Sequence, residues 1–70
     1  MANTMYKGVV FNKGDKVKIT ADWIEGNKPI AVITGFQVNG GVRFAIVKWK
    51  SRQLADEYGN LFTFDEMRKM

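Results

Sequence analysis

Few residues in this chain could catalyse a reaction. The sequence contains no histidine and no cysteine, and its only serine is Ser51. Histidine is the commonest general base, and a serine or cysteine nucleophile needs a base beside it. The same two absences exclude a disulfide framework and an ordinary zinc site. Seven carboxylates remain, but adjacent ones such as Asp56 and Glu57 diverge on a strand or helix and do not form a catalytic pair. We therefore expect no enzyme activity, no small-molecule substrate, no metal and no cofactor.

Positive charge is concentrated in the middle of the sequence. The formal net charge is +4. Residues 29–52 carry four basic residues and no acidic one, whereas residues 53–70 carry four acids against two bases. Lysine and arginine neutralise phosphates, and aromatic rings placed among them stack on unpaired bases. The pattern therefore favours a small accessory regulator that associates with nucleic acid or with a nucleoprotein complex.

Two sets of side chains are candidates for such a surface. The basic residues expected to contact phosphates are Lys16, Lys18, Arg43, Lys48, Lys50 and Arg52. The aromatic residues expected to contact the ligand are Trp23, Phe36 and Tyr58, with Phe44 as a further candidate for stacking. The alternative interpretation of the lysines is an ordinary solvated sheet face, on which they serve solubility and protect strand edges.

A central hairpin is the strongest structural prediction. Residues 30–38 are nearly continuous in apolar and β-branched side chains, residues 39–41 (Asn-Gly-Gly) tolerate the positive φ of a hairpin turn, and residues 42–49 return as the partner strand. Strict alternation places Ile30, Val32, Phe36 and Val38 on one face of the first strand, and Ala31 and Ile33 on the other. Both faces are thus apolar and should be covered, by the fold's own curvature, by a terminal helical turn or by another molecule.

The two-sided apolar hairpin supports a second hypothesis. The chain would be a protein-binding adaptor or inhibitor, of the kind found in phages and other mobile elements. It would dock through the apolar hairpin face and Trp23, with a homodimer as one form of this association. An exposed apolar surface of this size would otherwise be an aggregation hazard.

The other elements are short. Residues 1–5 are expected to be a flexible leader, residues 6–11 a short strand, residues 12–15 a turn, and residues 16–20 a half-buried strand with period-two alternation. Residues 21–28 are expected to form a structured loop whose tryptophan packs or protrudes. A turn at residues 58–60 leads into a short strand at residues 61–62. Thr63 and Glu66 match a capping box, which predicts a helical turn running to Arg68 or Lys69.

Four segments follow one another in a recognisable pattern: Gly14-Asp15-Lys16-Val17-Lys18-Ile19, Val32-Ile33-Thr34-Gly35-Phe36, Phe44-Ala45-Ile46-Val47-Lys48-Trp49, and Gly59-Asn60-Leu61-Phe62-Thr63-Phe64 with Glu66-Met67. Over about residues 11–67 this succession resembles the SH3-like small β-barrels of the KOW and YodC-like kind. The resemblance implies a mainly β fold, a small SH3-like barrel of four to five antiparallel strands with a short C-terminal helical turn, formed by residues 6–70 as a single domain.

One enzyme family is similar to the same pattern. The plasmid-borne type II dihydrofolate reductases line a tetrameric pore with a Val-Gln-Ile-Tyr segment. The corresponding residues here are Leu61-Phe62-Thr63-Phe64, which lack the glutamine and the tyrosine. The resemblance therefore implies no reductase activity.

Membrane and export signals are also missing from the sequence. The longest apolar stretch, residues 29–38, is interrupted by Thr34, Gly35 and Gln37 and falls far short of the roughly 20 residues that cross a bilayer. No basic region followed by a long apolar region and a cleavage site begins the chain. We expect a cytoplasmic protein without a membrane partner.

Overall fold

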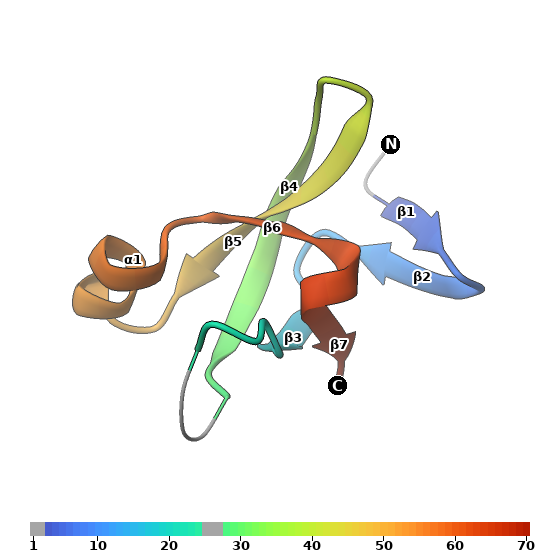
Figure 1. Ribbon diagram of the computed structural model, residues 1–70. Coiled ribbons are helices and arrows are strands. Elements are labelled where there is room, and N and C mark those ends of the chain that lie inside the picture. The colour runs from blue at the N-terminus through green and yellow to red at the C-terminus, as the bar shows by residue number, and fades with distance from the viewer. Residues whose placement is uncertain (1–2, 25–27) are drawn as a thin grey trace.

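The computed structural model describes residues 3–24 and 28–70 (Figure 1). These residues form antiparallel strands, one short α-helix and one 3-10 turn, which confirms the expected mainly β fold. In chain order, the elements are β1 (Asn3–Tyr6), β2 (Val9–Asn12), β3 (Lys16–Ile19), β4 (Ile30–Asn39), β5 (Val42–Trp49), α1 (Arg52–Tyr58), β6 (Leu61–Thr63), η1 (Phe64–Glu66) and β7 (Met67–Lys69).

The larger sheet has five strands in the order β6-β5-β4-β3-β7. Its two edge strands, β6 and β7, are therefore neighbours in sequence, and the 3-10 turn η1 carries the chain from one edge to the other (Figure 1). Within the described part of the chain, no strand pairing joins β6 to β7. The sheet thus brings its edges together through η1, and no hydrogen-bonded barrel closure is present among these residues.

The predicted hairpin is confirmed as β4 and β5. Its two-residue turn, Gly40-Gly41, has φ angles of 60° and 81°, which is the left-handed conformation that hairpin turns need. The register shifts at Thr34, between the pairs Ile33–Val47 and Gly35–Ile46. Such a bulge adds one residue to one strand, so alternation is inverted beyond it.

The bulge corrects the predicted faces of β4. Phe36 pairs with Ala45 and lies on the same face as Ala31 and Ile33, not with Ile30 and Val32 as strict alternation predicts. The inner face of the hairpin is buried at Ala31, Ile33, Ala45, Val47 and Trp49, but it is open near the turn, where Val38 is 67% exposed. The outer face stays partly exposed, since Val32 and Phe44 are only half-buried.

The core is formed by inward-facing apolar side chains from both sheets and from the turns that connect them. No polar or charged residue among the described residues is buried in it. Its members are Phe11, Val17, Ile19, Ala21, Ile24, Ala31, Ile33, Ala45, Val47, Trp49, Phe62, Phe64 and Met67.

A second, two-stranded sheet precedes the larger one. β1 pairs with β2 around a turn at Lys7 and Gly8, whose φ angles are 49° and 80°. Residues 3–5, expected to belong to a flexible leader, thus lie in a strand, and residues 1–2 of that leader lie outside the described residues. The predicted strand at residues 6–11 is divided by this turn. Phe11 is buried and attaches the small sheet to the core.

The helix α1 is not predicted from the sequence. The Ser51 hydroxyl caps it by accepting a hydrogen bond from the Gln53 N–H at 3.2 Å. Gly59 ends it with a φ of 80°. The Trp49 indole N–H donates to the Gly59 carbonyl at 2.7 Å, so the end of the helix is fixed to the end of β5.

The predicted C-terminal helical turn is too long. It ends at Glu66, and residues 67–69 form strand β7 beside β3, with Ile19 opposite Met67. Extended backbone here satisfies the open edge of β3 and buries Met67, which a further helical turn would not do.

The loop after β3 is described to Ile24, and residues 25–27 of the predicted loop lie outside the described residues. Ile24 is buried, whereas Trp23 is half-exposed. The Lys28 ammonium donates to the carbonyls of Ala21 and Ile24. Within the described ranges, no helix is long and apolar enough to span a bilayer.

Candidate nucleic-acid interface

Lysines gather on the outer face of β3, β4 and β5. Lys16 pairs with Val32 on β4, and Val32 pairs with Lys48 on β5, so the three form one row across the sheet. Directly paired residues have their side chains on the same face. The intervening residues Val17 and Val47 are buried, which leaves both lysines exposed on the outside.

A second row lies one step along the strands. Lys18 pairs with Ile30 on one side and with Arg68 of β7 on the other. Like charges placed directly opposite each other across two strands are destabilising. Repulsion between Lys18 and Arg68 therefore makes the binding of an anion to this face more favourable.

A groove with a volume of about 620 Å³ lies over the first row and reaches Ile30 of the second. Three lysines, Lys16, Lys48 and Lys50, line it, and its apolar lining includes Ile30, Val32 and Met70. The Met70 N–H donates to the Lys16 carbonyl at 3.3 Å, which extends the β3–β7 pairing to the end of the groove. We call this feature the basic groove, with Lys18 and Arg68 beside it.

The cations of the basic groove have no acidic partner among the described residues. The ion pairs found within residues 3–24 and 28–70 are Lys7–Asp65 and Lys69–Asp15, each with an N–O distance of 3.3 Å. Both lie off the groove, and Glu66 is used within η1. Several positive charges of the groove are therefore left for an external anion.

Two predicted phosphate contacts lie elsewhere. Arg43 pairs with Val38 near the hairpin turn and lines a different hollow, together with Tyr6 and Asp65. Arg52 is the first residue of α1. The structure thus brings four of the six predicted basic residues together and leaves two apart.

The predicted aromatic residues do not lie on the basic groove. Trp23 stacks on Phe62 with ring centroids 5.9 Å apart and an interplanar angle of 9°, and its ring lies 5.6 Å from that of Tyr58. Tyr58 also contacts Trp49, at 5.8 Å between centroids. These rings form an aromatic cluster between the loop after β3 and α1, with Trp23 still 53% exposed.

Phe36 is directed to the core instead. Its ring stacks on Phe64 at 6.1 Å, because the bulge at Thr34 turns it inward. Phe44 keeps an outward register position, opposite Gln37 and Thr63, and is half-buried.

Arg68 and Met70 belong to the site but are missed by sequence reasoning. The sequence predicts a helical turn that runs to residue 68 or 69, and a helical turn there would not add a strand to the sheet. That prediction therefore gives Arg68 and Met70 no place on a sheet face. The alternation of apolar Met67 with basic Arg68 is the signal that indicates β7.

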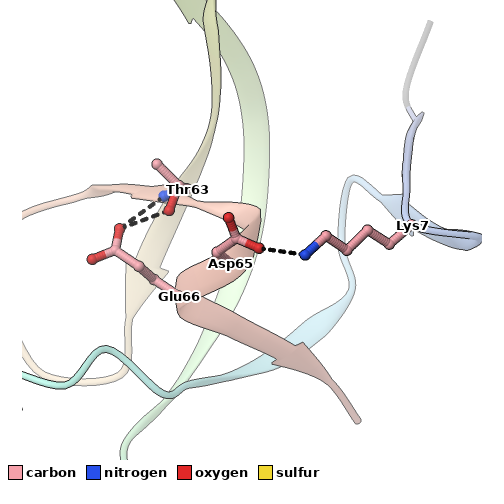
Figure 2. Close-up of polar contacts among 4 residues, drawn as sticks. All are labelled: Lys7, Thr63, Asp65 and Glu66. Carbon is pink, nitrogen blue, oxygen red and sulfur yellow. Dashed lines mark hydrogen bonds and ion pairs between the residues drawn. The ribbon is translucent and has the colours of Figure 1, made fainter.

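The acidic residues act in local contacts. The Glu66 carboxylate accepts hydrogen bonds from both the N–H and the hydroxyl of Thr63, each at 3.0 Å (Figure 2). The predicted capping box is thus present. Figure 2 also shows Asp65, on the same turn, reaching the Lys7 ammonium.

Two carboxylates have shifted acidities. The Tyr6 hydroxyl, and after it the Lys7 ammonium, hold the pKa of Asp65 below its ordinary value. The Asn12 N–H at 2.8 Å, and after it Lys69, hold the pKa of Asp15 below its ordinary value. Both shifts favour the charged form, and neither group is poised to exchange protons near neutral pH. No cluster of potential metal ligands occurs within residues 3–24 and 28–70.

Comparison of this chain with protein-family models, with curated proteins and with solved structures finds no match.

Proposed function

We propose that this chain is a small non-catalytic module that binds nucleic acid through the basic groove. The observation that carries the proposal is a set of cations on one sheet face that have no acidic partner in the described part of the chain: Lys16, Lys18, Lys48, Lys50 and Arg68. Lys16, Lys48 and Lys50 line the groove, and Lys18 and Arg68 lie beside it on the neighbouring strands β3 and β7. A partner with closely spaced negative charges would relieve their mutual repulsion and release its own counterions.

The fold that we propose for this module is an SH3-like small barrel. The strand order β6-β5-β4-β3-β7 and the 3-10 turn between the two edge strands support it. In such an arrangement the inner face is filled by the core, so a ligand must use the outer face or the ends of the strands.

Salt dependence is the first test of the proposal. If about five phosphates are contacted, the logarithm of the association constant should fall against the logarithm of salt concentration with a slope of roughly −4 to −5. The measurement is fluorescence anisotropy of a labelled oligonucleotide over a salt series. Absence of binding at low salt, or binding that salt does not weaken, would contradict the proposal.

Charge reversal locates the surface. The double variant Lys16→Glu/Lys48→Glu should weaken binding by more than tenfold, since two phosphate contacts become repulsive. The matched control, Lys13→Glu/Arg43→Glu, makes the same change in net charge outside the groove and should retain most of the affinity. Equal losses in both double variants would show that only the net charge matters.

A second candidate function is association through the apolar outer face. The side chains of Val42 and Leu61 are 48% and 44% exposed on this face. Ile46 of β5 lies on the same face, paired with Gly35 of β4 and with Leu61 of β6. The form of this function that a single measurement can test is a homodimer. The mass in solution from light scattering should then be that of a dimer, and Leu61→Asp should give a monomer; a monomer at every concentration argues against it.

A further inference from the structure

We infer that the ligand of the basic groove is a double-stranded nucleic acid, bound across one of its grooves without sequence preference. The inference rests on the proposed function and specifies its ligand. It follows from where the cations lie relative to the apolar part of the groove, and from where the aromatic rings lie.

Grouped along the strands instead of across the sheet, the cations form two rows with an apolar strip between them, and 'row' has this meaning from here on. One row, on β3 and β7, contains Lys16, Lys18 and Arg68, and the other, at the end of β5, contains Lys48 and Lys50. Strand β4 separates them and contributes the apolar residues Ile30, Ala31 and Val32 to the strip.

The width of this arrangement suits two phosphate backbones. Neighbouring strands lie about 4.8 Å apart, so β3 and β5 are separated by roughly 10 Å. The grooves of a DNA duplex are about 6 Å and 12 Å wide, with a row of phosphates along each side. A single strand has one such row and would leave half of the cations without a partner.

The aromatic rings do not support recognition of a single strand. Proteins that bind single strands place aromatic side chains in the basic groove so that bases stack on them. Trp23 and Tyr58 are instead engaged with each other near α1, and Phe36 is stacked on Phe64 in the core. Trp49 lines the groove, but it is only 5% exposed and its indole N–H donates to the Gly59 carbonyl, so its ring offers no face to a base. Phe44 has an outward position but lies four residues before Lys48 on β5, which is about 13 Å along the strand.

The strip between the two rows offers little to read base sequence. Specific readout needs hydrogen-bond donors and acceptors that reach base edges. Ile30, Val32 and Met70 provide none from their side chains, apart from the weak acceptor sulfur of methionine. Binding should therefore depend on the spacing of phosphates and not on the order of bases.

The test compares four probes with the full chain by fluorescence anisotropy: a DNA duplex, an RNA duplex, one of the DNA strands alone, and a DNA duplex of unrelated sequence. At least one kind of duplex should bind on the order of tenfold more tightly than the single strand, with a steeper salt slope. The two DNA duplexes should bind within about twofold of each other. Comparison of the affinities for the DNA duplex and the RNA duplex shows which kind of duplex is preferred.

Variants of each row test the two-row geometry. Lys16→Ala/Lys18→Ala and Lys48→Ala/Lys50→Ala should each remove most of the preference for duplex over single strand, because the first change leaves only Arg68 in its row and the second leaves no cation in the other. Phe44→Ala is the matched control on the same strand face and should leave both affinities unchanged, with circular dichroism confirming that all variants fold.

Three results would overturn the inference while leaving nucleic-acid binding intact: a single strand bound as tightly as the duplexes, a loss of affinity in Phe44→Ala, or a strong difference between the two DNA duplexes. Absence of binding to all four probes at low salt would contradict the proposed function itself.

Discussion

Asp15 stabilises the turn between β2 and β3 at the scale of a single side chain. Its Oδ2 atom accepts a hydrogen bond from the Asn12 N–H at 2.8 Å and lies 3.3 Å from the Lys69 ammonium. The Lys69 ammonium also donates to the Val10 carbonyl at 2.7 Å. One carboxylate and one ammonium thus connect β2, the turn and β7.

This contact predicts a pH dependence of stability. The Asn12 N–H and then Lys69 lower the pKa of Asp15 in the folded state. The stabilisation is therefore complete above the unfolded pKa of about 3.9 and is lost as the pH falls through the lower folded pKa. Thermal unfolding of Asp15→Asn should show a smaller loss of stability on acidification below about pH 4 than the parent chain. Asp22→Asn, an exposed carboxylate elsewhere, is the control and should keep the parent's pH profile; an unchanged profile in Asp15→Asn would contradict the prediction.

Residue-scale contacts are predictable when they are local in sequence. The capping box of Thr63 and Glu66 follows from their spacing and is present. The Trp23 indole N–H also reaches Glu66, at 3.4 Å, but 43 positions separate the two residues and no local pattern indicates the contact. The same limit explains why the sequence could not place Trp23 beside Phe62.

At the scale of elements, the hairpin turn sets the register of β4 and β5. Gly40 and Gly41 both have positive φ, whereas Gly35, at the bulge, does not, and a Cβ there would lie 3.5 Å from Ile46 Cδ1. Gly40 and Gly41 are therefore required by the backbone conformation of the turn, whereas Gly35 is not required by its φ angle.

Substitution by alanine should separate them. Gly41→Ala should lower the free energy of unfolding by about 1–2 kcal/mol, because an L-residue is strained in the left-handed region. Gly35→Ala, the control, meets Ile46 at an ordinary contact distance and should change the free energy by less than about 0.5 kcal/mol. Urea denaturation followed by circular dichroism measures both, and similar losses in the two variants would disprove the assignment.

Elements were predictable where one pattern dominates. Continuous β-branched sequence and Asn39-Gly40-Gly41 identify the hairpin, and period-two alternation identifies β3. The bulge at Thr34 has no sequence signal of comparable strength, so strict alternation predicts the wrong face for Phe36. The sequence does not predict α1, although Ser51 and Gly59 mark its ends, because a helix of seven residues is too short to show a helical periodicity of apolar residues.

At the scale of the whole molecule, the two sheets meet at Phe64. This buried residue begins η1, between the edge strands β6 and β7. Its ring lies 5.0 Å from that of Phe11 and 5.7 Å from that of Tyr6, both in the small sheet, and Phe36 approaches from β4. The small sheet is thus joined to the larger one through an aromatic contact that no single segment of sequence contains.

Truncation of Phe64 should therefore affect the whole fold. Replacing a buried phenylalanine by alanine costs about 3–5 kcal/mol, which is comparable to the entire stability that a core of this size provides. Phe64→Ala should be largely unfolded, and Phe64→Leu, which keeps part of the apolar contact, should lose about 1–2 kcal/mol and still unfold in one transition. Val38→Thr, at a position 67% exposed, is the control and should stay within about 0.5 kcal/mol of the parent. Thermal and urea unfolding, followed by near-UV circular dichroism for aromatic packing, measure all three. If the two sheets share one core around Phe64, weakening the packing of this residue must destabilise both sheets together. Unchanged stability of Phe64→Leu, or separate melting of the small sheet in the parent chain, would therefore contradict a shared core.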